Sequence, residues 1–198
     1  MKRSMVLIAW TSLLLVTRVA ARAEEALEGH FLFGGSGGVV IPTGEFSEGF
    51  SAGGMGTAFF GVTGRRFGAR FLFGSSEPGT RRLMNDAYSA RLGRPVKVTE
   101  AIVPAELQGI AAFPAQTSRL AVVLQAGAGL HNVTIRLKGT DKRLDEDNHF
   151  GFSTGAGVRY NIIPPGDKKA MALGLNGVFQ NTGSIRYYTV QLELTFVL

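Results

Sequence analysis

The histidines His30, His131 and His149 are the residues that acid–base or nucleophilic catalysis would use in this chain. An esterase of the Ser–His type needs both side chains within hydrogen-bond reach of each other. His149 and Ser153 are four residues apart, which corresponds to about 13 Å along an extended strand. This spacing does not indicate an enzyme, and we predict no catalytic residues.

Two other segments have the residue types of ligand sites. GSSEPGTR (residues 74–81) has the glycine spacing of a phosphate loop, but Thr80 and Arg81 stand where Lys and Ser or Thr are required. The acidic run DEDN (residues 145–148) offers oxygen ligands for a divalent cation, but it lacks a calcium-loop pattern and follows Lys142 and Arg143. We interpret both segments as exposed loops, and we expect no metal and no cofactor.

The loop that ends at residue 97 has an excess of positive charge. Its basic residues are Arg81, Arg82, Arg91, Arg94 and Lys97, with only Glu77 and Asp86 as acidic counterparts. Guanidinium groups bind phosphates well, so one interpretation is contact with lipopolysaccharide. The other interpretation is a basic loop without a partner.

The last twelve residues, YYTVQLELTFVL, alternate between apolar and mostly polar side chains, as a strand with two different faces does. Other strand-like segments repeat the pattern, and their polar faces carry four ionisable residues: Arg70, Glu106, Arg159 and Glu193. A hydrophobic core would not accept four such groups without strong compensation. The interior of a small membrane barrel accepts them if they pair, and the apolar faces then meet lipid.

The elements that must position these residues are eight candidate strands. They span residues 30–41, 53–63, 66–75, 98–113, 118–131, 150–162, 170–180 and 187–198. Long and short connections alternate between them, which is typical of an outer-membrane barrel with surface loops at one end and tight turns at the other. We therefore predict an all-β, eight-stranded antiparallel up-and-down transmembrane β-barrel, preceded by a cleavable signal peptide.

Adjacent strands in such a barrel bring particular charges together. Arg70 and Glu106 lie on neighbouring strands and are expected to pair directly, whereas Arg159 and Glu193 would meet across the lumen. Inward glycines, among them Gly127, are expected to make room for these long side chains, or alternatively to serve strand curvature. Beyond His131 the alternation changes phase, which indicates a bulge or a change of environment.

The first residues resemble a secretory signal peptide. Lys2 and Arg3 precede an apolar run, and an A-x-A site ends at Ala23. We expect a signal peptide at residues 1–23 and an outer-membrane barrel domain at residues 24–198. Four of the 21 basic residues and none of the 15 acidic ones leave with the signal, so the formal charge falls from +6 to +2. A nucleic-acid partner is therefore not indicated, and the absence of cysteine excludes a disulfide framework.

The segment IPTGEFSEGFSAGGMGTAFFG, after a glycine-rich first strand, resembles the bacterial outer-membrane β-barrel domain family, the small eight-stranded OmpA- and OmpX-like barrels. The likeness rests on the GGSGG, PTGEF and Gly53-Gly54 motifs and on the final strand, and it covers nearly the whole mature chain. Its motifs identify an architecture and not an activity. The family's last strand usually ends in an aromatic residue that the barrel-assembly machinery recognises, whereas this chain ends in Leu198, two residues after Phe196.

Two function classes stay open. The first is a monomeric structural or interaction barrel in the outer membrane of a Gram-negative bacterium, with a plugged lumen, long surface loops, and lipid, lipopolysaccharide and the assembly machinery as partners. The second is transport of small or hydrophobic solutes across the outer membrane. A soluble periplasmic ligand-binding barrel is a third possibility. Large charged side chains inside an eight-stranded barrel favour the first class.

Overall fold

The computed structural model describes residues 30–114, 118–140, 142–163, 169–183 and 185–198 of the chain. The expected signal peptide at residues 1–23 lies outside these residues. No helix in the described part of the chain is long and apolar enough to cross a membrane.

Eight antiparallel strands close into a barrel in which each strand pairs with its neighbours along the chain and β1 pairs with β8. The strands are β1 His30–Thr43, β2 Phe50–Thr63, β3 Phe67–Thr80, β4 Val98–Phe113, β5 Leu120–Leu137, β6 Arg143–Ile163, β7 Ala170–Thr182 and β8 Ile185–Val197. This up-and-down order confirms the predicted fold class.

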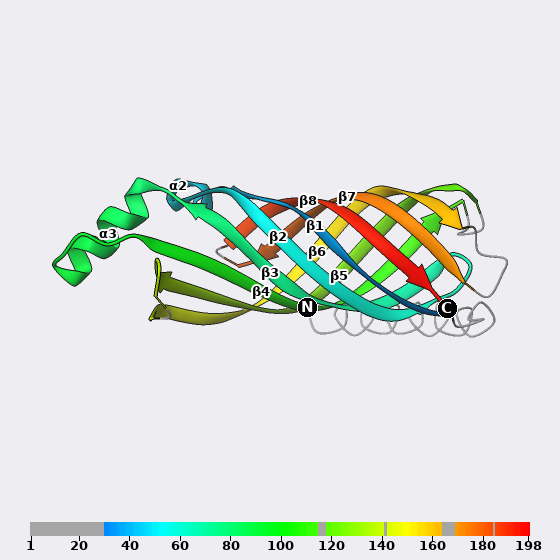
Figure 1. The fold of residues 1–198 in the computed structure, drawn as a ribbon, viewed down its shortest axis with the longest axis horizontal. Coiled ribbons are helices and arrows are strands. Elements are labelled where there is room, and N and C mark those ends of the chain that lie inside the picture. The colour runs from blue at the N-terminus through cyan, green and yellow to red at the C-terminus, as the bar shows by residue number, and fades with distance from the viewer. Residues whose placement is uncertain (1–29, 115–117, 141, 164–168, 184) are drawn as a thin grey trace, which may run out of the picture.

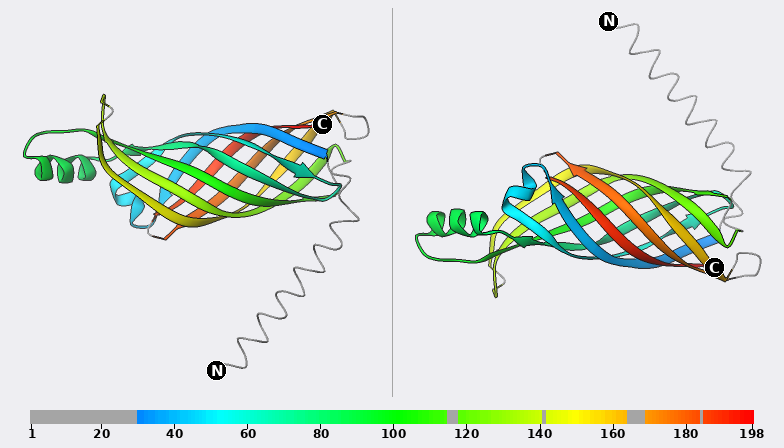
Figure 2. Two further views of the ribbon diagram at one scale, coloured as in Figure 1. Left: turned by 90° about the horizontal axis from the view of Figure 1, so that it is seen from below. Right: turned by 90° about the horizontal axis from the view of Figure 1, so that it is seen from above.

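The two ends of the barrel differ (Figure 1). One end, which we call the turn end, holds the start of β1, the end of β8 and the short connections β2–β3, β4–β5 and β6–β7. The other end, which we call the loop end, carries two helices, α2 (Phe46–Gly49) and α3 (Arg82–Leu92). Figure 2 shows α3 and the β5–β6 hairpin extending beyond the remaining strands at the loop end.

Strand alternation separates an apolar outer face from a polar inner face. In β8, Leu192 is 62% exposed on the outside of the barrel, whereas its neighbour Glu193 is 3% exposed on the inside. The same alternation runs through β3, β4, β6 and β7. The outer face of these strands is thus mainly apolar, as the predicted faces required.

The strands of the β5–β6 hairpin are longer than predicted. β5 continues to Leu137 and β6 begins at Arg143, and their register stays regular from Leu120 to Ile135. No bulge lies directly after His131, because the register shifts only after Ile135. The change of phase instead marks the point where the kinds of side chain on the two faces of the strand change. Val133 remains on the inner face, where it joins a buried apolar cluster, while the outer face becomes polar beyond Leu130.

The sequence analysis predicted no helices, yet α3 occupies most of the β3–β4 connection. Its residues include the helix formers Leu, Met, Ala and Arg, and Gly93 ends it in the left-handed conformation with φ +66°. The N–H groups of Gly93 and Arg94 return to carbonyls of the last turn. Weak amphipathic periodicity hid this helix because it extends away from the barrel and buries few side chains.

Candidate functional site

Arg70 is the centre of a hydrogen-bond network inside the barrel. Its Nε donates to Gln108 Oε1 at 2.9 Å, its Nη2 to Gln125 Oε1 at 2.7 Å and its Nη1 to Glu193 Oε2 at 2.7 Å. The guanidinium also lies 4.3 Å from the centroid of the Phe59 ring. One arginine therefore connects β3 with β4, β5 and β8, and its charge is balanced by a buried carboxylate.

The expected charge pairs are wrong, although all four residues lie inside the barrel and are at most 6% exposed. Arg70 pairs with Glu193 instead of Glu106. Among the described residues, no direct ion pair joins Glu193 to Arg159. The register explains the first difference, because the β4 residue opposite Arg70 is Gln108. Glu106 lies two positions nearer to the loop end, where its carboxylate finds other partners.

Glu106 is the centre of a second cluster in the lumen, next to the first. Ser153 Oγ and Gln108 Nε2 both donate to Glu106 Oε2, at 2.6 and 2.9 Å. His131 Nε2 lies 3.0 Å from Glu106 Oε1, and both side chains are fully buried. Because Gln108 also accepts from Arg70, the two clusters form one continuous unit, which we call the lumen network.

Tyr187 extends the lumen network toward the loop end. Its hydroxyl donates to Gln180 Oε1 and lies 3.5 Å from His131 Nδ1. The alternation of β4 and β5 puts Gln108, Gln125 and His131 on the inner face, but the sequence analysis did not name them as members of a network. Their shared phase with Arg70 and Glu106 was the available signal, but it did not identify which of these side chains bind each other.

Arg159 lies inside the barrel nearer to the turn end. Along the ladder it faces Gly174 of β7, which in turn faces Glu193 of β8. No hydrogen bond from the Arg159 side chain is found among the described residues, so its interaction with Glu193 is electrostatic and not a direct contact. Gly174 leaves open space between them, since an added Cβ would meet no atom closer than 3.6 Å.

Other inward glycines are required because the network fills the lumen. A Cβ at Gly127 would lie 2.6 Å from Gln108 Cγ and 3.0 Å from Ser153 Oγ. A Cβ at Gly151 would lie 3.0 Å from the His131 ring. These contacts are shorter than van der Waals distance, so at these two positions glycine makes room for Gln108, Ser153 and His131, and not for the Arg and Glu side chains that were expected.

Apolar clusters occupy the lumen on both sides of the network. At the loop end the cluster consists of Val40, Phe46, Phe50, Ile102, Val133, Ile185 and Tyr187, with Met84 of α3 packed against it. Toward the turn end a smaller cluster consists of Leu32, Phe59, Leu72 and Val197. The lumen is thus filled at three levels, two apolar and one polar.

The residues considered for catalysis or metal binding are not brought together. Ser153 donates to Glu106, whereas His149 Nε2 lies 3.5 Å from Asp147 Oδ2. Within the described ranges, no group of three or more His, Asp and Glu side chains is placed to hold a metal ion. In the acidic run, Asp145 accepts from Arg91 and Glu146 from Arg143, so these carboxylates are engaged with basic neighbours.

Contacts with β6 and β4 hold α3, which carries part of the basic loop. Tyr88 Oη donates to Asp145 Oδ2 at 3.1 Å, and Arg91 Nη1 lies 3.0 Å from the same oxygen. The hydrogen bonds from Arg91 and Tyr88 lower the pKa of Asp145, which lies beyond the apolar outer belt that ends at Phe150. Burial, followed by the bond to Asp145, raises the pKa of Tyr88.

Only part of the basic loop is free to meet a partner. Arg81 Nε donates to the Phe50 carbonyl, Arg82 pairs with Asp86, and Arg91 is held by Asp145. Arg94 and Lys97 are exposed and form no ion pair with the described residues. The structure adds exposed Lys138, whose N–H donates to the Lys97 carbonyl at 2.8 Å. Arg94, Lys97 and Lys138, which we call the loop-end basic group, are candidates for an anionic partner.

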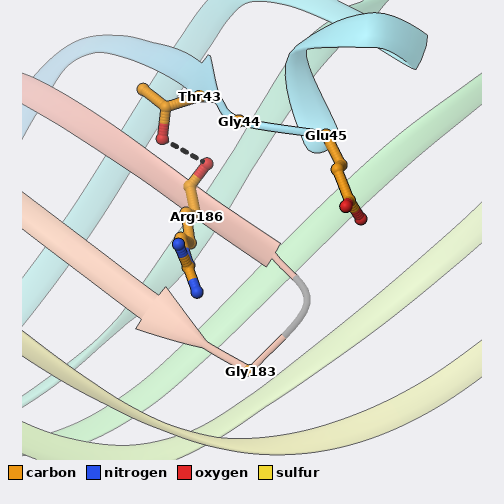
Figure 3. A pocket seen from close by; sticks show the side chains of 5 residues that line it. All are labelled: Thr43, Gly44, Glu45, Gly183 and Arg186. Carbon is orange, nitrogen blue, oxygen red and sulfur yellow. Dashed lines mark hydrogen bonds between the residues drawn. The ribbon is translucent and has the colours of Figure 1, made fainter.

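A pocket lies at the rim of the loop end, separate from the lumen network (Figure 3). It is lined by Thr43, Gly44, Glu45, Gly183 and Arg186, and Thr43 Oγ1 donates to the Arg186 carbonyl at 3.1 Å. These residues belong to the end of β1, the β7–β8 turn and the start of β8. The pocket therefore belongs to the loop connections.

Comparison with known proteins identifies the architecture. No family model and no curated protein sequence matches the chain. Among solved structures it is similar to Neisserial surface protein A (NspA), with a TM-score of 0.58 and 12% identity over 85% of this chain and 96% of that one. It is also similar to Ail, the attachment invasion locus protein of Yersinia pestis, in complex with the heparin analogue sucrose octasulfate, with a TM-score of 0.52 and 10% identity over 87% of this chain and 100% of that one.

A third similar structure is a major outer membrane protein from Thermus thermophilus, with a TM-score of 0.51 and 10% identity over 86% of this chain and 99% of that one. The similar chains are covered almost completely, so the likeness extends over the whole barrel. The chain thus has the fold of the eight-stranded outer-membrane barrels, as the resemblance of its sequence implied.

Proposed function

We propose that this eight-stranded barrel resides in the outer membrane of a Gram-negative bacterium as a structural and interaction protein with a closed lumen. The turn end would face the periplasm, and the loop end, with α3, would face the exterior. The continuous apolar outer belt supports insertion into lipid, because such a surface on a soluble barrel would be exposed to water.

The observation that carries the proposal is the filling of the lumen. Arg70, Gln108 and Gln125 cross its middle, and apolar clusters lie on either side. An eight-stranded barrel has an interior just wide enough for side chains to fill. A solute that passes through the lumen would have to break the buried Arg70–Glu193 pair and leave a buried charge without a partner. The geometry therefore favours a plug over a pore.

The interaction role is assigned to the loop end. There the β5–β6 hairpin and α3 extend beyond the other strands (Figure 2), and the loop-end basic group is exposed. Phosphate groups of lipopolysaccharide at this end of the barrel would match this charge. The structure of Ail with sucrose octasulfate supports the idea that a barrel of this fold can hold a highly anionic sugar.

Conductance in planar bilayers tests the closed lumen. The native barrel is expected to insert without producing discrete conductance steps. A variant with Arg70→Ser, Glu193→Ser and Phe59→Ala, which empties the middle of the lumen, should leak more than a variant with Phe71→Ala and Leu192→Ala on the outer face. Discrete steps from the native barrel would contradict the proposal and favour transport of small solutes.

Binding to purified lipopolysaccharide tests the partner. Replacing Arg94, Lys97 and Lys138 by Gln should weaken binding of the refolded barrel, and the loss should shrink at high salt because exposed charges are screened. The matched control replaces Arg82, which already pairs with Asp86. Equal binding by the triple variant and the native barrel would exclude the loop-end basic group as the contact.

A further inference from the structure

The turn end of the barrel has basic side chains in each of its three connections. Arg65 and Arg66 lie between β2 and β3, Arg119 directly before β5, and Lys169 directly before β7. All four are exposed, and none forms an ion pair with the described residues. We call these residues the turn-end basic ring.

Among the described residues, the turn-end basic ring has little acidic compensation. Glu193 is the acidic residue of β8, and it is 3% exposed and paired with Arg70. Within the described residues, no exposed acidic side chain lies at this end. Outside the described residues, Asp167 and Lys168 of the β6–β7 connection offset each other in formal charge, and Glu24, Glu25 and Glu28 precede β1 in the sequence.

Backbone hydrogen bonds fix two of these residues, Arg66 and Arg119, at the edge of the apolar belt. The Arg66 carbonyl accepts from Ala112 N at 2.8 Å, and the Arg119 carbonyl accepts from Asn161 N at 2.7 Å. Each residue is followed directly by an outward apolar side chain, Phe67 after Arg66 and Leu120 after Arg119, which are 54% and 61% exposed. The long basic side chains therefore begin where the apolar outer surface ends.

We propose that the turn-end basic ring binds the phosphate headgroups of anionic phospholipids in the leaflet that surrounds the turn end. Two features favour a lipid leaflet over a protein partner. The charges lie at the depth where the apolar belt ends, which is the depth of the headgroups. They also come from three separate connections around the circumference of the barrel. A protein that docks on one side of the barrel would need its basic contacts in a single patch on that side.

The inference rests on the proposed membrane location. The expected size of the preference for anionic lipid follows from the attraction between basic side chains and an anionic surface. Each Lys or Arg near an anionic surface changes binding about fivefold. Removing the four charges should therefore abolish most of the preference for an anionic lipid over a neutral one. High salt should reduce the preference of the native barrel as well.

Electron spin resonance of spin-labelled lipids provides the test. The full barrel is reconstituted into phosphatidylcholine bilayers, and the association of spin-labelled phosphatidylglycerol is compared with that of spin-labelled phosphatidylcholine. The native barrel is expected to prefer phosphatidylglycerol, and a variant with Arg65→Gln, Arg66→Gln, Arg119→Gln and Lys169→Gln should lose at least about tenfold of that preference. The control variant with Arg94→Gln, Lys97→Gln and Lys138→Gln carries its changes at the opposite end and should keep it.

The outcomes separate this inference from the proposed function. If the barrel inserts and shows no preference for phosphatidylglycerol, or if the loop-end variant loses as much preference as the turn-end variant, the inference is wrong while the membrane location stands. Retained preference in the turn-end variant would also overturn it. If the barrel stays soluble and shows no heat-dependent gel shift in any lipid, the membrane location itself fails. Binding to purified cell wall without a lipid preference would assign the ring to a different partner and overturn the inference.

Discussion

The Arg70 guanidinium and the Glu193 carboxylate meet at 2.7 Å inside the barrel, although β3 and β8 are not adjacent strands. The pair crosses the lumen, and Asn176 Nδ2 and Thr195 Oγ1 also donate to the same carboxylate group. A carboxylate with this many donors is bound tightly in one position, and its removal leaves several of them without a partner.

The first prediction concerns this pair. Glu193→Ala should lower the free energy of unfolding by about 3–5 kcal/mol because it leaves the Arg70 charge buried and unpaired. Arg70→Met in the Glu193→Ala background should recover part of the loss. Urea unfolding of the reconstituted barrel measures both. The control is the exposed Arg82–Asp86 pair, which should contribute only about 0.3–0.5 kcal/mol. Additive effects of the Arg70 and Glu193 changes would contradict a direct contact.

The second prediction concerns the packing of the lumen. Gly127→Ala places a methyl group against Gln108 and Ser153 and should destabilise the barrel by about 1–3 kcal/mol, as overpacking does in a core. Gly109→Ala is the matched control, because its Cβ faces outward and would meet no atom closer than 3.9 Å. Unfolding free energies of the two variants give the comparison, and a lumen that is loose and hydrated would tolerate both changes equally.

The third prediction concerns the outer belt. Leu192→Arg places a charge where we propose that lipid contacts the barrel, and near the bilayer midplane it should cost about 2–4 kcal/mol. Leu83→Arg makes the same change on α3, where Leu83 is 59% exposed and outside the belt, and should alter stability by about 0.5 kcal/mol or less. Folding in vesicles measures both. A similar cost at the two positions would mean that Leu192 does not face lipid.

The fourth prediction concerns the attachment of α3. Asp145 has a pKa below its ordinary value of 3.8 because Arg91 and Tyr88 bind its ionised form. A lowered pKa means that this attachment is fully present above about pH 3.8 and is lost as the pH falls through the lowered value. The helix should therefore stay attached at neutral pH and separate from β6 only in stronger acid.

Paired spin labels can follow this separation, since the chain contains no cysteine of its own. Labels at Leu83→Cys and Thr140→Cys report the distance from α3 to the β5–β6 hairpin. Asp145→Asn should broaden the distance distribution at neutral pH, whereas Asp147→Asn, whose carboxylate lies near His149 instead, should not. An unchanged distribution in Asp145→Asn would show that other contacts, such as that of Asn85 with the Val98 amide, hold the helix.

Much of the architecture could be predicted from sequence because alternation is a local property. Each strand residue points to the face opposite to that of its neighbour, so the sequence alone placed Arg70, Glu106, Arg159 and Glu193 inside and Leu192 outside. The lengths of the connections then separated the two ends of the barrel. Neither inference requires knowledge of which strands lie across the lumen from each other.

The partners of the charged residues depend on tertiary structure. Closure of the barrel brings β8 within reach of β3 across the lumen, and the register sets Gln108 beside Arg70. Arg70 therefore pairs with Glu193, and Glu106 lies next to His131. Helix α3 escaped prediction for a related reason, because Met84 and Tyr88, which attach it to the barrel, contact residues distant in sequence. The sequence by itself determined which face each side chain occupies, since that follows from the backbone of its own strand. Only the closed barrel decided which side chains bind each other, since those contacts depend on the relative depth and direction of residues from strands that are far apart in the chain.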